Sequence, residues 1–134
     1  MTEGSGQDLP LLDSSVLDRL REDLEDDDSI WRVFVRDFLA ELPRRMQNIR
    51  QTFTSGDPVG ALDAVLSLRT SSQMVGAERL AGLAFNLEQS VREETRSADP
   101  AEALPVLAAA HLRQLQRCAQ QTTNVLEAHL RRKD

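Results

Sequence analysis

The stretch PVGALDAVLSLRTSSQMVGA, residues 58–77, carries the clearest structural pattern in the sequence. Its small and apolar side chains recur every three or four residues, at Ala61, Val65, Leu68, Ser72 and Val75. This spacing places them on one face of a helix. Asp57 and Pro58 form a helix start, and Gly76 interrupts the pattern. The stretch therefore predicts an amphipathic helix over residues 58–74.

The segments before this helix repeat the pattern. A short helix is expected after Asp13-Ser14-Ser15, which offers N-caps, with an apolar face of Val16, Leu17, Leu20 and Leu24. A long helix is expected from near Ser29 to about Phe53. Its inward residues are Trp31, Phe34, Val35, Phe38, Leu42, Ile49 and Phe53.

Two more helices are expected after Gly76. The first ends near Thr95 and turns inward Leu80, Leu83, Leu87 and Val91. The second runs from Pro100 to about Arg132 and turns inward Leu104, Ala108, Leu115, Ala119, Thr122 and Leu126. Together these segments predict an all-α fold, an up-down-up-down four-helix bundle with a short extra N-terminal helix. Residues 1–12, which are rich in glycine and serine, are expected to be a flexible leader, and residues 13–134 the bundle.

The amino-acid composition disfavours several classes of partner and site. The chain has 16 basic and 22 acidic residues, a net charge of −6, which disfavours nucleic acid and anionic membranes as partners. It has no apolar run long enough to span a membrane and no N-terminal signal pattern, so we expect a soluble, cytoplasmic protein. The single cysteine, Cys118, can form neither an internal disulfide nor a thiolate metal site. We expect no metal and no cofactor.

An acidic run occupies residues 22–28. It is interpreted as a solvated linker whose carboxylates favour the start of the next helix. A divalent-cation site is the alternative, but the run lacks the alternating Asp/Asn ligands and the central glycine of a calcium loop.

Residues 65–77, Val-Leu-Ser-Leu-Arg-Thr-Ser-Ser-Gln-Met-Val-Gly-Ala, resemble the signature of histidine-containing phosphotransfer (HPt) domains. That signature reads Ala-His-x-Leu-Lys-Gly-Ser-(Ser/Ala)-x-x-(apolar)-Gly-Ala. The following Leu80-Ala81-x-Leu83-Ala84-x-x-Leu87-Glu88 is similar to the next helix of the family, with its Leu-Glu pair. Upstream, Phe38-Leu39-x-x-Leu42-Pro43 and Gly56-Asp57 also resemble family features. The resemblance covers about residues 13–95.

The resemblance implies a bundle that relays phosphoryl groups between aspartates on receiver domains of two-component systems. It aligns the phosphate-accepting histidine of the family with Leu66, the following lysine with Arg69, and a small glycine with Thr70. Leucine has no lone pair and cannot form a phosphoramidate. Arg69 keeps the positive charge of the lysine, but on a planar guanidinium in place of a compact ammonium group. Thr70 adds bulk at a position where the glycine of the family lets a partner come close to the backbone.

Other residues are weak replacements for the missing acceptor. Ser67, Thr70, Ser71 and Ser72 carry hydroxyls, but a phosphate ester is too stable to pass onward and no general base is visible beside them. His111 and His129 lie 18 positions apart, roughly 27 Å along a helix, so they cannot ligate one metal. Both fall in the apolar stripe of the last helix and are expected to be half-buried. Cys118 is expected to be a small core residue.

Leu66 is expected at the edge of the buried stripe, beside Val59, Leu62, Arg69, Thr70 and Gln73. It is either an exposed leucine without a role or the apolar centre of a docking surface, with Arg69, Gln73 and Arg79 at the rim. The leading hypothesis is a non-enzymatic pseudo-HPt module that docks a response-regulator receiver or a hybrid histidine kinase without carrying phosphate. The alternative is a structural or oligomerisation bundle with no receiver partner. A phosphotransferase that uses an unusual residue ranks last.

Overall fold

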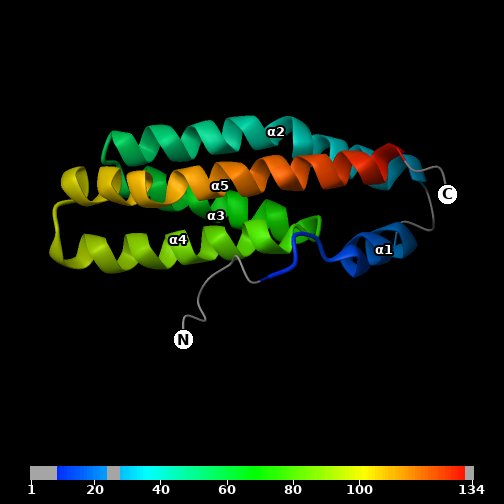
Figure 1. The fold of residues 1–134 in the computed structure, drawn as a ribbon, viewed down its shortest axis with the longest axis horizontal. Helices are drawn as coiled ribbons and strands as arrows, with labels where there is room; N and C mark the ends of the chain where they lie inside the picture. The colour runs from blue at the N-terminus through cyan, green and yellow to red at the C-terminus, as the bar shows by residue number, and fades with distance from the viewer. Residues whose placement is uncertain (1–8, 24–27, 132–134) are drawn as a thin grey trace.

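The computed structural model describes residues 9–23 and 28–131, which form five helices and no strand (Figure 1). The helices are α1 (Ser14–Asp23), α2 (Asp28–Thr54), α3 (Pro58–Met74), α4 (Glu78–Ser97) and α5 (Pro100–Arg131). Each corresponds to a helix expected from the sequence, and the all-α prediction is confirmed.

The four long helices lie side by side along the long axis of the molecule (Figure 1). Helix α3 packs against α2 and α4, and α5 packs against α4 and α2. Short turns connect them, so successive helices run in opposite directions. This is the predicted up-down-up-down bundle, with α3 and α5 diagonally opposed. The short α1 packs against α2.

Aspartate side chains fix the starts of three helices. Asp13 Oδ1 accepts a hydrogen bond from the Ser15 amide, and Asp99 Oδ1 accepts one from the Ala101 amide, both at 3.0 Å. Asp57 caps α3 in the same way. Each carboxylate satisfies an amide that has no partner within the first turn of its helix. These caps explain why the helices begin where the sequence predicts.

The inward faces predicted from the sequence form one core. Every residue expected inside α3 and α5 is buried, and so are those of α2 except the partly buried Phe34. In α4, Leu83 is partly buried and packs against this core. Leu17 of α1 is buried, whereas the side chains of Leu20 and Leu24 lie outside the described residues.

Part of the expected leader, residues 1–12, is also outside the described residues, namely 1–8. Leu11 and Leu12 pack against the core. No helix in the described part of the chain is long and apolar enough to cross a membrane.

Candidate functional site

Helix α3 carries the motif on one continuous segment because local signals fix both of its ends. At its start, the Asp57 side chain accepts a hydrogen bond from the Gly60 amide at 3.0 Å. At its end, the Ala77 amide donates to the Ser72 carbonyl at 2.8 Å, and Gly76 has a φ of +76°. A positive φ at this position favours glycine and stops the helix.

Gly76 also allows a close contact with the segment before α1. The Asp13 amide donates to the Gly76 carbonyl at 2.7 Å. A Cβ atom on Gly76 would lie 2.6 Å from the Asp13 carbonyl oxygen, which is closer than real Cβ contacts come. The glycine of the motif is therefore required both by its own backbone and by the chain that crosses the turn between α3 and α4.

Six of the seven residues predicted for the docking surface lie together on one flank of α3. We call this flank the α3 face; its members are Val59, Leu62, Leu66, Arg69, Thr70 and Gln73. Val59 is 74% exposed, and Thr70 and Gln73 are exposed. Leu62 and Leu66 are partly buried. As predicted, Leu66 lies at the edge of the buried stripe and not inside the core.

Arg69 does not extend freely from this face. Its Nη1 donates to Oε1 of Glu88 on α4 at 2.7 Å, and its guanidinium lies 5.0 Å from the centre of the Phe85 ring. A guanidinium over an aromatic face is attracted by the electrons of the ring. Arg69 is thus held against α4 by two interactions, and 31% of its side chain remains exposed.

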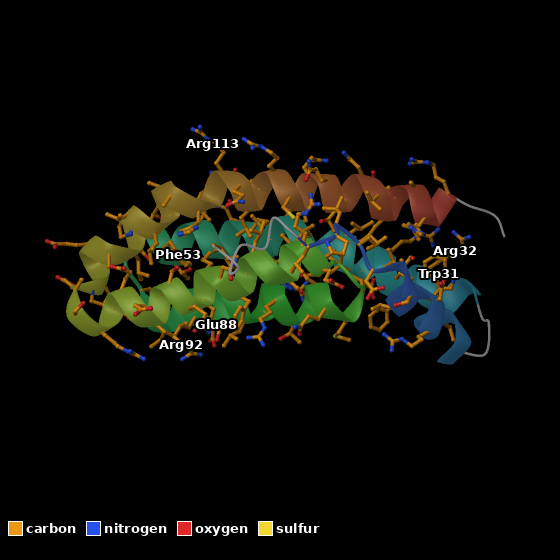
Figure 2. The ribbon with its side chains drawn as sticks, turned by 60° about the horizontal axis from the view of Figure 1, so that its bottom comes forward. Trp31, Arg32, Phe53, Glu88, Arg92 and Arg113 are labelled. Atoms are coloured by element: carbon orange, nitrogen blue, oxygen red, sulfur yellow. The ribbon has the colours of Figure 1, made fainter. Side chains whose placement is uncertain are left out.

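Glu88 is the buried centre of this ion cluster. Its side chain is 6% exposed, and its second oxygen, Oε2, accepts a hydrogen bond from Arg92 Nη2 at 3.0 Å. Figure 2 shows Glu88 and Arg92 one turn apart on α4. A buried carboxylate is costly unless both of its oxygens are paired, and here both are. Two arginines paired with one glutamate leave a net positive charge on this cluster between α3 and α4.

The sequence indicated only part of this cluster. Glu88 and Arg92 are four positions apart, a spacing at which opposite charges meet on a helix. Arg69 is 19 positions before Glu88, and nothing in the local pattern pairs them. Phe85 was missed because it falls outside the apolar stripe of α4; it is 42% exposed.

The structure does not bring Arg79 to the α3 face. Its Nε donates to the Leu9 carbonyl at 2.8 Å, and its side chain lines a groove between α4 and α5. Arg69, Gln73 and Phe85 line a different groove, between α3 and α4, of about 430 Å³. Arg79 follows the motif closely in sequence, but it points from α4 toward α5.

Both histidines are on α5 and partly buried, as expected. His111 lines the α4–α5 side of the bundle with Leu83 and Gln114. Cys118 is buried, as expected, and burial raises the pKa of its thiol; a hydrogen bond with Thr122 and the positive charge of Arg79 act in the opposite direction. Since the chain has only these two histidines, helix α3 offers no imidazole.

Of the four hydroxyls of α3, those of Ser67 and Ser71 are hydrogen-bonded and that of Ser72 is buried. Ser67 Oγ accepts a hydrogen bond from Arg45 Nε at 3.2 Å, and Ser71 Oγ donates to the Ser67 carbonyl at 2.8 Å. Ser72 Oγ is fully buried. Thr70 is exposed. The Ser71 hydroxyl donates its proton to a backbone carbonyl, so no general base activates it as a nucleophile.

The two interpretations of the acidic run 22–28 are not tested, because residues 24–27 lie outside the described part of the chain. Within residues 9–23 and 28–131, no group of three or more His, Cys, Asp or Glu side chains is arranged to hold a metal ion.

Residues 33–125, more than half of the chain, match the family model of the Hpt domain. The chain belongs to the Hpt domain family. Domains of this family are phosphotransfer modules of phosphorelays; they carry phosphoryl groups and interact with receiver domains and kinases.

A solved structure agrees with this assignment. The crystal structure of histidine-containing phosphotransfer protein B (HptB) from Pseudomonas aeruginosa PAO1 is similar to this Hpt domain, with a TM-score of 0.74 and 24% sequence identity. The match covers 93% of this chain and 98% of that one. At this identity the similarity establishes the fold. No curated protein sequence matches the chain.

Proposed function

We propose that this Hpt domain docks a receiver domain, of a response regulator or a hybrid histidine kinase, without carrying a phosphoryl group. The proposal depends on one observation: Leu66, which the family resemblance aligns with the acceptor histidine, lies partly buried at the edge of a helix that keeps its cap and its terminal glycine. The helix, its caps and its terminal glycine support docking, whereas the side chain at the acceptor position does not support transfer.

The chemistry of the α3 face supports the absence of transfer. A phosphoryl group that passes to a receiver aspartate must leave a good donor, and the imidazole nitrogen provides one as a phosphoramidate. The side chain of Leu66 has no atom that can bond phosphorus. His111 and His129 lie on α5, diagonally across the bundle from α3.

The surface properties of the α3 face support docking. Val59, Leu62 and Leu66 form an apolar strip, and the net positive Arg69–Glu88–Arg92 cluster lies beside it. The resemblance implies receivers with an acidic pocket, which this charge complements. We expect this docking complex to be weak and transient, with a small interface, below ~1,200 Å².

The first prediction concerns phosphorylation. When the chain is incubated with a phosphorylated receiver domain, or with a kinase and labelled ATP, we expect no acid-labile, base-stable label, because no imidazole is present on α3. Gel autoradiography after acid and base treatment measures this. A label that is lost in His111→Ala would contradict the proposal and would assign transfer to α5.

The second prediction concerns binding. Leu66→Asp is expected to abolish binding of any receiver that binds the unmodified chain, since it places a negative charge against an acidic pocket. Titrations by NMR or calorimetry measure the dissociation constants. Val106→Asp is the matched control: Val106 is 67% exposed on α5, so the same kind of substitution there should leave binding unchanged. Amide spectra of both variants verify the fold.

Two results of this titration would reject the docking proposal. Receivers could bind the Leu66→Asp variant as well as they bind the unmodified chain, which would separate binding from the α3 face. The full set of receiver domains from the source genome could also fail to bind the unmodified chain. The structural-bundle alternative would then explain the chain better.

A further inference from the structure

A second groove runs between α4 and α5. It consists of two adjoining hollows, of about 280 and 230 Å³, that share Leu83 and Gln114. The first hollow is completed by Arg79, Arg117, Cys118 and Gln121, and the second by Asn86, Leu87, His111 and Leu115. We call the two hollows together the α4–α5 groove. The docking proposal uses none of these residues.

The charge of the α4–α5 groove is opposite to that of the protein. The chain has a net charge of −6, yet the lining contains two arginines and no carboxylate. Arg79 donates to a neutral carbonyl, that of Leu9. Among the described residues, neither Arg79 nor Arg117 forms an ion pair, whereas Arg44, Arg69 and Arg92 do. The groove therefore holds uncompensated positive charge at one end.

Hydrogen-bonding and apolar groups continue from this end along the groove. The side-chain amides of Gln114, Gln121 and Asn86 can donate and accept hydrogen bonds. Leu83, with Leu87 and Leu115 beyond it, supplies an apolar floor. Arg117 and His111 are six positions apart on α5, about 9 Å along its axis. This combination of cations, amide groups and an apolar floor is typical of sites that bind a small organic ligand.

We propose that the α4–α5 groove binds a small organic phosphate of nucleotide size. The phosphate lies between Arg79 and Arg117, because guanidinium groups present paired N–H donors that match phosphate oxygens. The organic part extends over Leu83 toward Asn86 and His111. This site lies on the side of α4 that faces α5, and it does not depend on whether a receiver docks on the α3 face.

The test is a titration of the full chain, followed by amide NMR and calorimetry, with adenosine 5′-monophosphate as the probe. We expect saturable shifts at Arg79, Leu83, Gln114 and Arg117. Inorganic phosphate should bind more weakly to the same residues, since it lacks the organic part. Adenosine should not bind, since it lacks the charge. If inorganic phosphate bound with the same affinity as adenosine 5′-monophosphate, the nucleoside would contribute nothing to binding. That result would overturn the assignment to an organic phosphate.

Two variants distinguish a specific binding site from general attraction between opposite charges. Arg117→Gln is expected to weaken binding of adenosine 5′-monophosphate at least tenfold. Arg113→Gln is the matched control, because Arg113 lies one turn earlier on α5, is exposed and points away from the bundle (Figure 2). It removes the same charge and should change the affinity less than twofold. Equal losses in the two variants, or shifts that do not saturate, would reject the site. Binding of an acidic peptide, but not of the nucleotide, to the groove would also reject it.

Discussion

Replacing Phe53 with alanine is expected to lower the free energy of unfolding by about 3–5 kcal/mol. Phe53 is fully buried and is the largest such side chain in the structure. It lies in the last turn of α2, just before the turn that leads to α3. The truncation removes apolar surface from the core and leaves a cavity that four packed helices can close only in part. Urea unfolding followed by circular dichroism measures the loss.

Phe85→Ala is the matched control for this prediction. Phe85 is 42% exposed, so alanine there creates no cavity in the core. It removes the ring beneath the Arg69 guanidinium, a contact worth about 0.5–1 kcal/mol at an exposed site. The two substitutions delete the same atoms, and their costs should differ at least threefold. Similar costs would show that the register of α2, or the outward position of Phe85, is incorrect.

The helices of this domain could be predicted because their signals are local. Helix α3 begins at Pro58 and ends at Met74, as the sequence predicts, since Asp57 caps its start and Gly76 adopts the positive φ that ends it. The apolar periodicity then determines which face is buried. Caps and periodicity are properties of neighbouring residues, so no knowledge of the tertiary structure is needed to identify them.

The site was less predictable because its interactions cross between helices. The alignment of Leu66 needs only the motif. The pairing of Arg69 with Glu88 depends on which helices pack side by side and on how far α4 is shifted along α3, and neither is a property of neighbouring residues. For the same reason the sequence alone predicts Arg79 at the rim of the docking surface, whereas in the structure Arg79 lines the α4–α5 groove. The contact between Asp13 and Gly76 joins segments more than 60 positions apart and has no local signal.

Leu66→His is expected to convert the unlabelled chain into a phosphoacceptor. A phosphorylated receiver domain that binds the unmodified chain should transfer label to this variant, and the label should be acid-labile and base-stable. The position is partly exposed on α3, so an imidazole can replace the leucine at the edge of the core without being sealed inside it. Autoradiography and the rate of loss of receiver phosphate measure the transfer.

The neighbouring threonine should limit the rate of this transfer. Thr70 is exposed one turn after Leu66, at the position that the resemblance aligns with a glycine of the family, so its side chain adds bulk to the proposed docking surface. Adding Thr70→Gly to Leu66→His should raise the transfer rate at least tenfold, although glycine within a helix costs about 1 kcal/mol of stability. Thr70→Gly alone should remain unlabelled, because it gives the receiver more room but supplies no imidazole.

Ser67→His tests whether the position of the imidazole on α3 matters. Residue 67 is also exposed, but it lies about 100° further around the helix, toward α2, where its hydroxyl accepts a hydrogen bond from Arg45. An imidazole there should receive no label, because the docked receiver would present its aspartate to residue 66. Equal labelling of the two histidine variants would mean that the receiver does not bind in one fixed orientation. No labelling of Leu66→His, despite unchanged receiver binding, would show that residue 66 does not face the receiver aspartate.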